Sequence, residues 1–102
     1  MGQNSNQNTQ SKTINIEVLN IKKIDNAGNL KALADFRLNQ SEFYSWRIIH
    51  EGKHPWVSCP QDSWEADGKK HYKPLIKFPK NLMDIVSSAI LNAYDESNNT
   101  GI

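Results

Sequence analysis

The side chains best suited to chemistry are concentrated in one lysine-rich segment, residues 69–80. It contains five lysines and no acidic residue, and aromatic side chains lie between the lysines. Lysines attract phosphate groups and an exposed aromatic ring can stack on an unpaired base, so this combination suits nucleic-acid binding. We therefore predict a nucleic-acid-binding site formed by Lys69, Lys70, Lys73, Lys77 and Tyr72. The alternative is a solvent-exposed edge strand that is protected from aggregation by its lysines.

The residues immediately before this segment carry the opposite charge. Residues 61–67 contain three carboxylates and no basic side chain, with Trp64 among them. A large aromatic residue in a polar segment is either a packing anchor or a stacking or partner contact, so Trp64 is a candidate partner contact. Residues 61–70 show no hydrophobic periodicity and are predicted to form a loop. They do not match a calcium-binding loop, because Lys73 stands where such a loop needs its closing glutamate.

Other residues with metal-binding or catalytic potential form no recognised pattern. His50 and His54 are four residues apart, but Gly52 between them disfavours the helix that this spacing needs. Together with Cys59 and His71 they match no zinc-ligand spacing. The chain also lacks a glycine-rich phosphate loop and a nucleophile motif. We therefore predict no metal, no cofactor, no small-molecule substrate and no enzyme activity.

Composition limits the class of protein. The chain has 102 residues, 37% of them hydrophobic, with a net charge of +1 and a single cysteine. One domain is expected from the length, and near-neutrality means that affinity for nucleic acid must come from local charge clusters. A lone cysteine forms no intramolecular disulfide, which favours a reducing compartment. No apolar run is long enough to span a bilayer and residues 1–10 lack the features of a secretory signal, so we predict a cytoplasmic protein with no membrane partner.

The distribution of apolar residues divides the chain into one domain and two tails. Half of residues 1–12 are Asn or Gln, and residues 96–102 are similarly polar. Such segments bury too little apolar area to offset the backbone entropy lost on folding, so both are predicted to be disordered. Residues 13–95 form the single predicted domain.

Hydrophobic periodicity predicts the elements that position these residues. Alternation predicts strands over residues 14–24, 30–38, 42–50 and 56–59, followed by a fifth, lysine-rich strand over residues 69–78 with Pro74 at an edge or a break. The first strand changes phase at Leu19, which indicates a β-bulge. After Pro79, apolar residues at helical spacing predict one C-terminal helix. The expected fold is α+β, an antiparallel sheet of about four to five strands with this helix packed on it.

Five segments occur in a particular order along the chain. They are residues 19–33 (LNIKKIDNAGNLKAL), 47–52 (RIIHEG), 56–60 (WVSCP), the pair Asp67-Gly68, and residues 89–94 (AILNAY). In this order and spacing they resemble the SpoVG (stage V sporulation protein G) family. The resemblance implies an α+β fold that forms a homodimer through its strands. It also implies a small bacterial regulator that binds DNA or RNA and is linked to septation in cell division and to sporulation.

Three side chains on the predicted strands bear on the expected dimer. Trp46 and Trp56 are predicted to be core or dimer-interface residues, because large aromatic side chains in strands usually pack. Arg47 matches the arginine at the end of a strand in the family. The resemblance therefore implies that Arg47 pairs with a carboxylate in the dimer and does not contact a ligand.

The chain departs from the family immediately after Pro60. The family has a basic tract at this position that is thought to contact nucleic acid, whereas residues 61–67 are acidic here. The family's contact residues therefore do not transfer, and the positive charge lies downstream in residues 69–80. Two functions follow. One is a dimeric nucleic-acid-binding regulator, and the alternative is a dimeric protein-interaction adaptor of the same fold that has lost nucleic-acid binding and uses Trp64 and the acidic segment.

Overall fold

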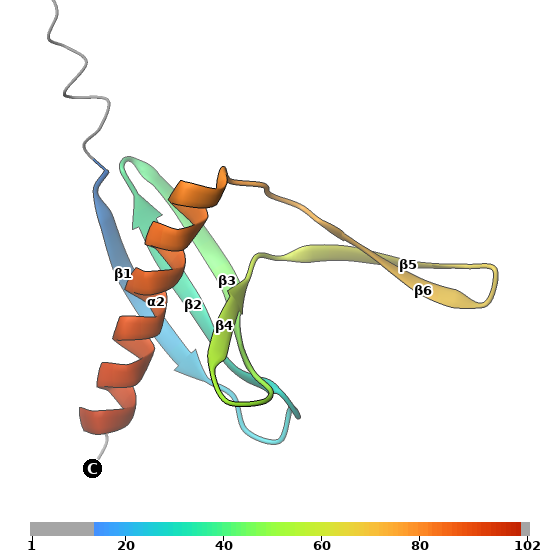
Figure 1. Cartoon of the computed structure of the whole chain (residues 1–102), viewed down its shortest axis with the longest axis horizontal. Coiled ribbons are helices and arrows are strands. Elements are labelled where there is room, and N and C mark those ends of the chain that lie inside the picture. The colour runs from blue at the N-terminus through green and yellow to red at the C-terminus, as the bar shows by residue number, and fades with distance from the viewer. Residues whose placement is uncertain (1–13, 101–102) are drawn as a thin grey trace, which may run out of the picture.

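Residues 14–100 are described by the structure, a computed structural model (Figure 1). In this part of the chain, four strands form one antiparallel sheet, two form a second sheet, and a single helix follows, so the predicted α+β class is confirmed. The predicted tail 1–12 lies outside the described residues. The elements are β1 (Ile16–Lys23), β2 (Leu30–Leu38), β3 (Ser41–His50), β4 (Pro55–Ser58), β5 (Gln61–Ala66), β6 (Lys69–Pro74) and α2 (Lys80–Thr100).

The larger sheet is an antiparallel meander in which β1, β2, β3 and β4 lie side by side in chain order. The turn between β1 and β2 contains Gly28 at a φ of 65°, a backbone conformation that glycine adopts without strain. The register shifts between Val18 and Asn20, which makes Leu19 the extra residue of a β-bulge. The predicted change of phase in the first strand is therefore confirmed.

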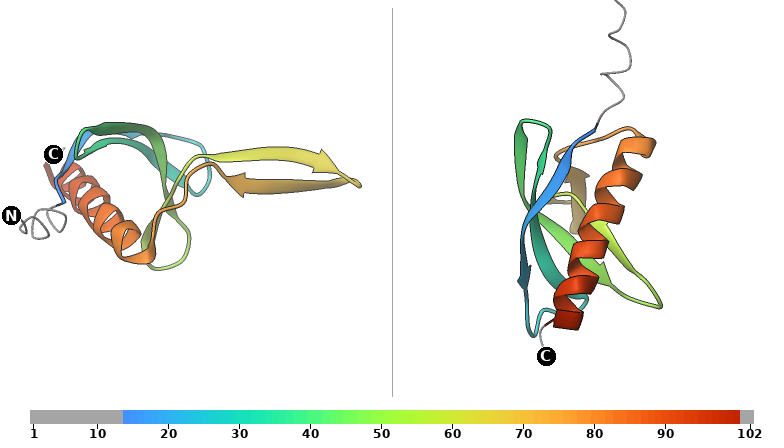
Figure 2. Two further views of the ribbon diagram at one scale, coloured as in Figure 1. Left: turned by 90° about the horizontal axis from the view of Figure 1, so that it is seen from above. Right: turned by 90° about the vertical axis from the view of Figure 1, so that its left-hand side faces the viewer.

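The core lies between this sheet and α2, which crosses one face of the sheet (Figures 1 and 2). Strict alternation along β2 directs every second side chain into the core, as period-2 strand geometry requires. Trp46 is 1% exposed and packs its ring edge-on against Phe36, with the ring centroids 5.0 Å apart. Trp46 is thus a core residue, whereas Trp56 is 45% exposed. The buried core consists of Ala32, Ala34, Phe36, Leu38, Trp46, Ile48, Val57, Val86 and Ile90.

The helix α2 begins after Pro79, as predicted, and the backbone N–H of Met83 donates to the Pro79 carbonyl oxygen at 2.9 Å. It continues to Thr100, so the predicted disordered tail is wrong for residues 96–100. Extending a nucleated helix adds one hydrogen bond for each residue that is fixed, so polar residues prolong it readily. The Ser97 carbonyl oxygen also accepts a hydrogen bond from Lys23 Nζ at 3.3 Å, which joins this last part of the helix to β1.

Residues 61–74 form a β-hairpin, called the arm below, which projects away from β1–β4 and α2, called the body (Figures 1 and 2). The prediction of a loop over residues 61–70 is wrong, because residues 61–66 form β5 and pair with β6. The predicted fifth strand over residues 69–78 is also corrected. It ends at Pro74, and it pairs with β5 instead of joining the larger sheet.

The turn of the arm explains why this hairpin forms. Asp67 and Gly68 connect the strands, with φ angles of 55° and 73°, and Ala66 lies opposite Lys69. Positive φ at both central residues defines a type I′ turn, whose twist matches that of the flanking strands and for which Asp-Gly is a favoured sequence. This dipeptide is the sequence signal for the hairpin. Periodicity does not reveal β5, because both faces of the arm are exposed and neither needs to be apolar.

Candidate nucleic-acid interface

The arm presents its side chains to solvent almost along its whole length. Every residue of β6 is exposed, as is every residue of β5 except Ala66. At the base of the arm, the backbone N–H of Leu75 donates to the Pro60 carbonyl oxygen at 3.0 Å, so the two ends of the hairpin are held together where it leaves the body. A two-stranded hairpin has little stability of its own in water.

Cross-strand pairing divides the arm into two faces, because directly opposite residues of an antiparallel pair point to the same side. One face, called the Trp64 face, is centred on Trp64 opposite His71. The other, called the Tyr72 face, is centred on Ser63 opposite Tyr72. The Trp64 face also contains Asp62, Ala66, Lys69 and Lys73, and the Tyr72 face also contains Gln61, Glu65, Lys70 and Pro74.

The aromatic side chains of the two faces have different neighbours. Trp64 and His71 stack with ring centroids 5.6 Å apart and an interplanar angle of 18°, and Trp64 remains 45% exposed. On the opposite face, Lys70 Nζ lies 6.0 Å from the ring centroid of Tyr72, a cation–π contact, and Tyr72 is 60% exposed. Each face therefore combines an accessible aromatic ring with at least one lysine.

The acidic segment and residues 69–74 of the lysine-rich segment are consecutive in the sequence and form the two strands of one ribbon. Asp62 lies opposite Lys73 and Glu65 lies opposite Lys70. Three carboxylates and three ammonium groups occur within residues 61–74, so the arm carries no net charge. The charge cluster predicted from residues 69–80 is therefore largely balanced by its neighbours in space, a relation that segment-by-segment charge counting cannot detect.

Two of the predicted lysines have no acidic residue directly opposite. Lys69 lies opposite Ala66, and Lys77 is exposed in the link between the arm and α2. Lys80, which contributes to the sequence cluster, forms an i,i+4 ion pair with Asp84 at 3.1 Å. The structure thus brings Lys69, Lys70, Lys73 and Tyr72 together on the arm, and places Lys77 beyond its base.

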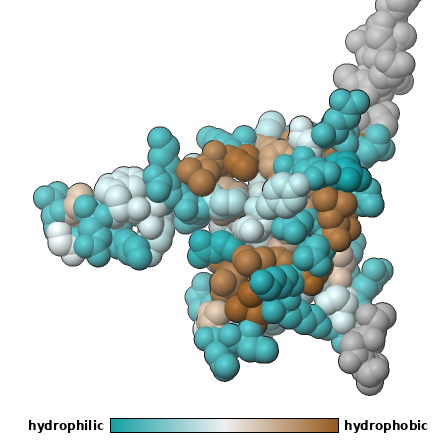
Figure 3. Space-filling view, turned by 180° about the vertical axis from the view of Figure 1, so that it is seen from behind, coloured by the Kyte–Doolittle hydropathy of each residue, from teal (hydrophilic) through white to brown (hydrophobic). Residues whose placement is uncertain are grey.

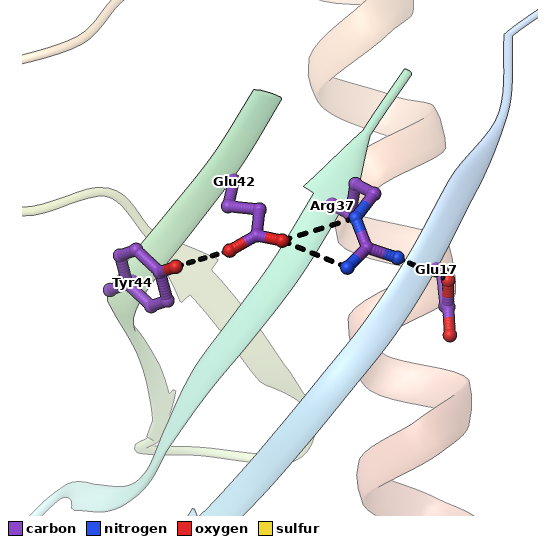
Figure 4. Close-up of polar contacts among 4 residues, drawn as sticks. All are labelled: Glu17, Arg37, Glu42 and Tyr44. Carbon is purple, nitrogen blue, oxygen red and sulfur yellow. Dashed lines mark hydrogen bonds and ion pairs between the residues drawn. The ribbon is translucent and has the colours of Figure 1, made fainter. Parts of the chain in front are cut away.

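A polar network occupies the face of the larger sheet opposite α2 (Figure 4). Arg37 contacts Glu17 on β1 at 2.9 Å and Glu42 on β3 at 2.8 Å, and the Tyr44 hydroxyl donates to Glu42. The network links three adjacent strands across their solvent-facing side. The hydrogen bond from Tyr44, followed by that from Arg37, holds the pKa of the Glu42 carboxyl below its usual range.

Replacing Tyr44 with phenylalanine is expected to raise the pKa of Glu42, because the hydrogen bond that contributes most to its lowering is removed. A lowered folded-state pKa stabilises the protein above the unfolded-state pKa, and this stabilisation is lost as the pH falls through the folded-state value. The variant should therefore lose less stability on acidification. An NMR titration of the Glu42 side-chain carboxyl measures the shift, with Tyr72→Phe on the arm as the matched control. An unchanged Glu42 pKa in Tyr44→Phe would contradict this assignment.

Arg47 also lies on the face opposite α2, but it takes no part in this network. It is opposite Leu33 on one side and Ser58 on the other, and its Nε atom is buried without a hydrogen-bond partner in the described part of the chain. The pairing implied by the family resemblance is with a carboxylate in the dimer, and it stays a prediction.

The candidate metal ligands are dispersed over several elements. His50 ends β3, His71 lies on the arm, and the Cys59 thiol donates to the Ile76 carbonyl oxygen at 3.3 Å. Across residues 14–100, no three His, Cys, Asp or Glu side chains gather in a way that could hold a metal ion. Over the same residues, no helix has both the length and the apolar character needed to cross a bilayer.

The fold and the arm define a small α+β protein with a projecting, solvent-exposed β-ribbon. No family model matches the chain, and a search of curated proteins found no match.

Proposed function

We propose that this chain is a nucleic-acid-binding protein that contacts the phosphates of DNA or RNA with the arm. The observation that carries the proposal is the exposed ribbon, on which Lys69, Lys70 and Lys73 lie beside accessible aromatic rings. Lysines that contact phosphates release condensed counterions, and aromatic side chains add contacts to bases. By its resemblance to the SpoVG family, the protein is proposed to be a bacterial cytoplasmic regulator linked to septation and sporulation, and not an enzyme.

We further propose that the binding species is a homodimer. The face of the sheet opposite α2 carries the exposed side chains of Tyr44 and Trp56, and the partly buried Arg47 lies on the same face. Tyr, Trp and Arg are the residues most enriched at the energetic centres of protein interfaces. Figure 3 looks onto this side of the molecule and shows several groups of hydrophobic residues, one of them over its lower part, with hydrophilic residues between and around them. A dimer would carry two arms, which increases affinity through avidity.

The balanced charge of the arm makes a quantitative prediction. Lys69 and Lys77 have no acidic residue opposite, so two phosphate contacts give an expected slope of log K against log salt of about −1.4 for single strands. Replacing Asp62 and Glu65 with Asn and Gln removes the carboxylates opposite Lys73 and Lys70, which should steepen this slope to about −3 and tighten binding about 10- to 100-fold at low salt. The matched control is Asp25→Asn with Glu51→Gln, which makes the same change in net charge at exposed positions on the body.

The experiment is a titration of labelled single-stranded DNA, duplex DNA and RNA at several salt concentrations. Sedimentation of the same samples gives the mass of the bound species, which the proposal requires to be a dimer. Tighter binding and a steeper slope for the arm variant, but not for the body variant, support an arm contact. Equal effects of the two variants would mean that net charge alone governs binding and would refute the arm as the contact.

A second candidate function is the dimeric protein-interaction adaptor. Two observations favour this function. The arm carries no net charge, and the side chains of Trp64 and Tyr72 on the arm and of Leu75 next to it are exposed. Exposed apolar groups flanked by balanced charges suit a protein partner better than a polyanion. On this alternative, neither the natural protein nor the double variant with Asp62→Asn and Glu65→Gln binds any nucleic acid at low salt.

A further inference from the structure

The two faces of the arm differ in their capacity to bind a flat ring. On the Trp64 face, His71 stacks on Trp64 from the opposite strand and supports it, while Trp64 keeps 45% of its surface exposed. On the Tyr72 face, the residue opposite Tyr72 is Ser63, which provides no supporting ring, and Lys70 lies over Tyr72 instead. A large ring held by a neighbour loses less conformational freedom when it binds, so the Trp64 face is better prepared to accept a further ring.

Lysines flank the supported ring on the same face. Lys69 and Lys73 each lie two residues from His71 along β6, and are therefore about 7 Å from it in opposite directions along the strand. A base stacked on Trp64 would have its neighbouring phosphates within reach of these ammonium groups. Among the paired residues of the Trp64 face, Asp62 carries the carboxylate, and it lies opposite Lys73. The Lys69 end is therefore the more favourable for a phosphate.

We infer that the Trp64 face binds single-stranded nucleic acid, with an unpaired base stacked on Trp64 and an adjacent phosphate on Lys69. This inference rests on the proposed function and specifies its substrate class. A two-stranded ribbon also fits the major groove of B-DNA, where base edges and not base faces are presented. In the major groove, the exposed surface of the Trp64 ring would meet no base face. The exposure of Trp64 therefore favours an unpaired base as its partner.

The test compares Trp64 with an exposed apolar residue that lies outside both proposed contact surfaces. Ile85 on α2 is 39% exposed and belongs to neither the arm nor the proposed dimer face, so Ile85→Ala is the control for Trp64→Leu. Trp64→Leu is expected to weaken binding of labelled oligothymidylate about 5- to 150-fold, the usual effect of losing one base–aromatic stack. The salt slope should be unchanged, because no lysine is altered. Ile85→Ala should bind as the natural protein does, and Trp64→Phe should recover part of the loss.

Tryptophan fluorescence provides a second measurement. Stacking of a base on Trp64 should quench emission when oligothymidylate is added, and this quenching should persist in Ile85→Ala and vanish in Trp64→Leu. The natural protein should bind single-stranded oligothymidylate more tightly than it binds the duplex of oligothymidylate with oligoadenylate. If Trp64→Leu binds with unchanged affinity and the same salt slope, base stacking is refuted while the proposed function stands. If the natural protein binds none of the probes at low salt, both are refuted.

Discussion

Replacing Trp46 with alanine is expected to lower the free energy of unfolding by about 3–5 kcal/mol, the usual cost of removing a large aromatic side chain from a core. Trp46 is 1% exposed, and its ring stacks on Phe78 at a centroid distance of 5.4 Å. Phe78 belongs to the link that leads from the arm into α2, so Trp46 joins that link to the sheet. A loss of this size is a large fraction of the stability of an ordinary small domain.

Urea denaturation followed by circular dichroism measures this loss. Trp64→Ala is the matched control, because it removes the same side chain from a position on the arm that is 45% exposed, and it should be much milder. Trp46→Phe should also be milder than Trp46→Ala. It keeps a ring in the core and removes an indole N–H that is buried without a hydrogen-bond partner within residues 14–100. Equal losses in Trp46→Ala and Trp64→Ala would contradict the burial on which this prediction rests.

Replacing the whole arm, residues 61–74, with the dipeptide Asn-Gly is expected to remove nucleic-acid binding and to leave the body folded. The backbone N–H of Leu75 already donates to the Pro60 carbonyl oxygen at 3.0 Å, so a two-residue turn can close the shortened chain between them. The arm carries three of the four predicted lysines and both candidate stacking rings. We therefore expect affinity at low salt to fall about 10²- to 10³-fold.

Two measurements on the armless protein separate binding from folding. Its thermal unfolding should remain cooperative, with a midpoint close to that of the natural protein, because the core residues all belong to the body. Its titration with oligothymidylate at low salt should show the loss of affinity. A folded armless protein that binds as tightly as the natural one would move the interface to the body and refute the arm as the binding element.

Periodicity predicted the elements that bury one face. The alternation along β2 and the helical spacing after Pro79 both arise because one side of each element packs in the core, and both predictions are confirmed. The same reasoning failed for residues 61–66, since a strand with two exposed faces has no apolar face to reveal it. It also ended the helix too early, because residues 96–100 are polar and extend a helix that is held by its earlier turns.

The candidate site divides in a similar way. The sequence alone determined which side chains are available, namely a group of lysines with interleaved aromatic rings and an acidic segment before it. Only the tertiary structure decided their partners. The turn at Asp67 and Gly68 sets the register of β5 and β6, and that register places Asp62 and Glu65 opposite two of the lysines and His71 against Trp64. The physical reason is that charge balance and ring stacking depend on distances across the ribbon, whereas the sequence orders residues only along it.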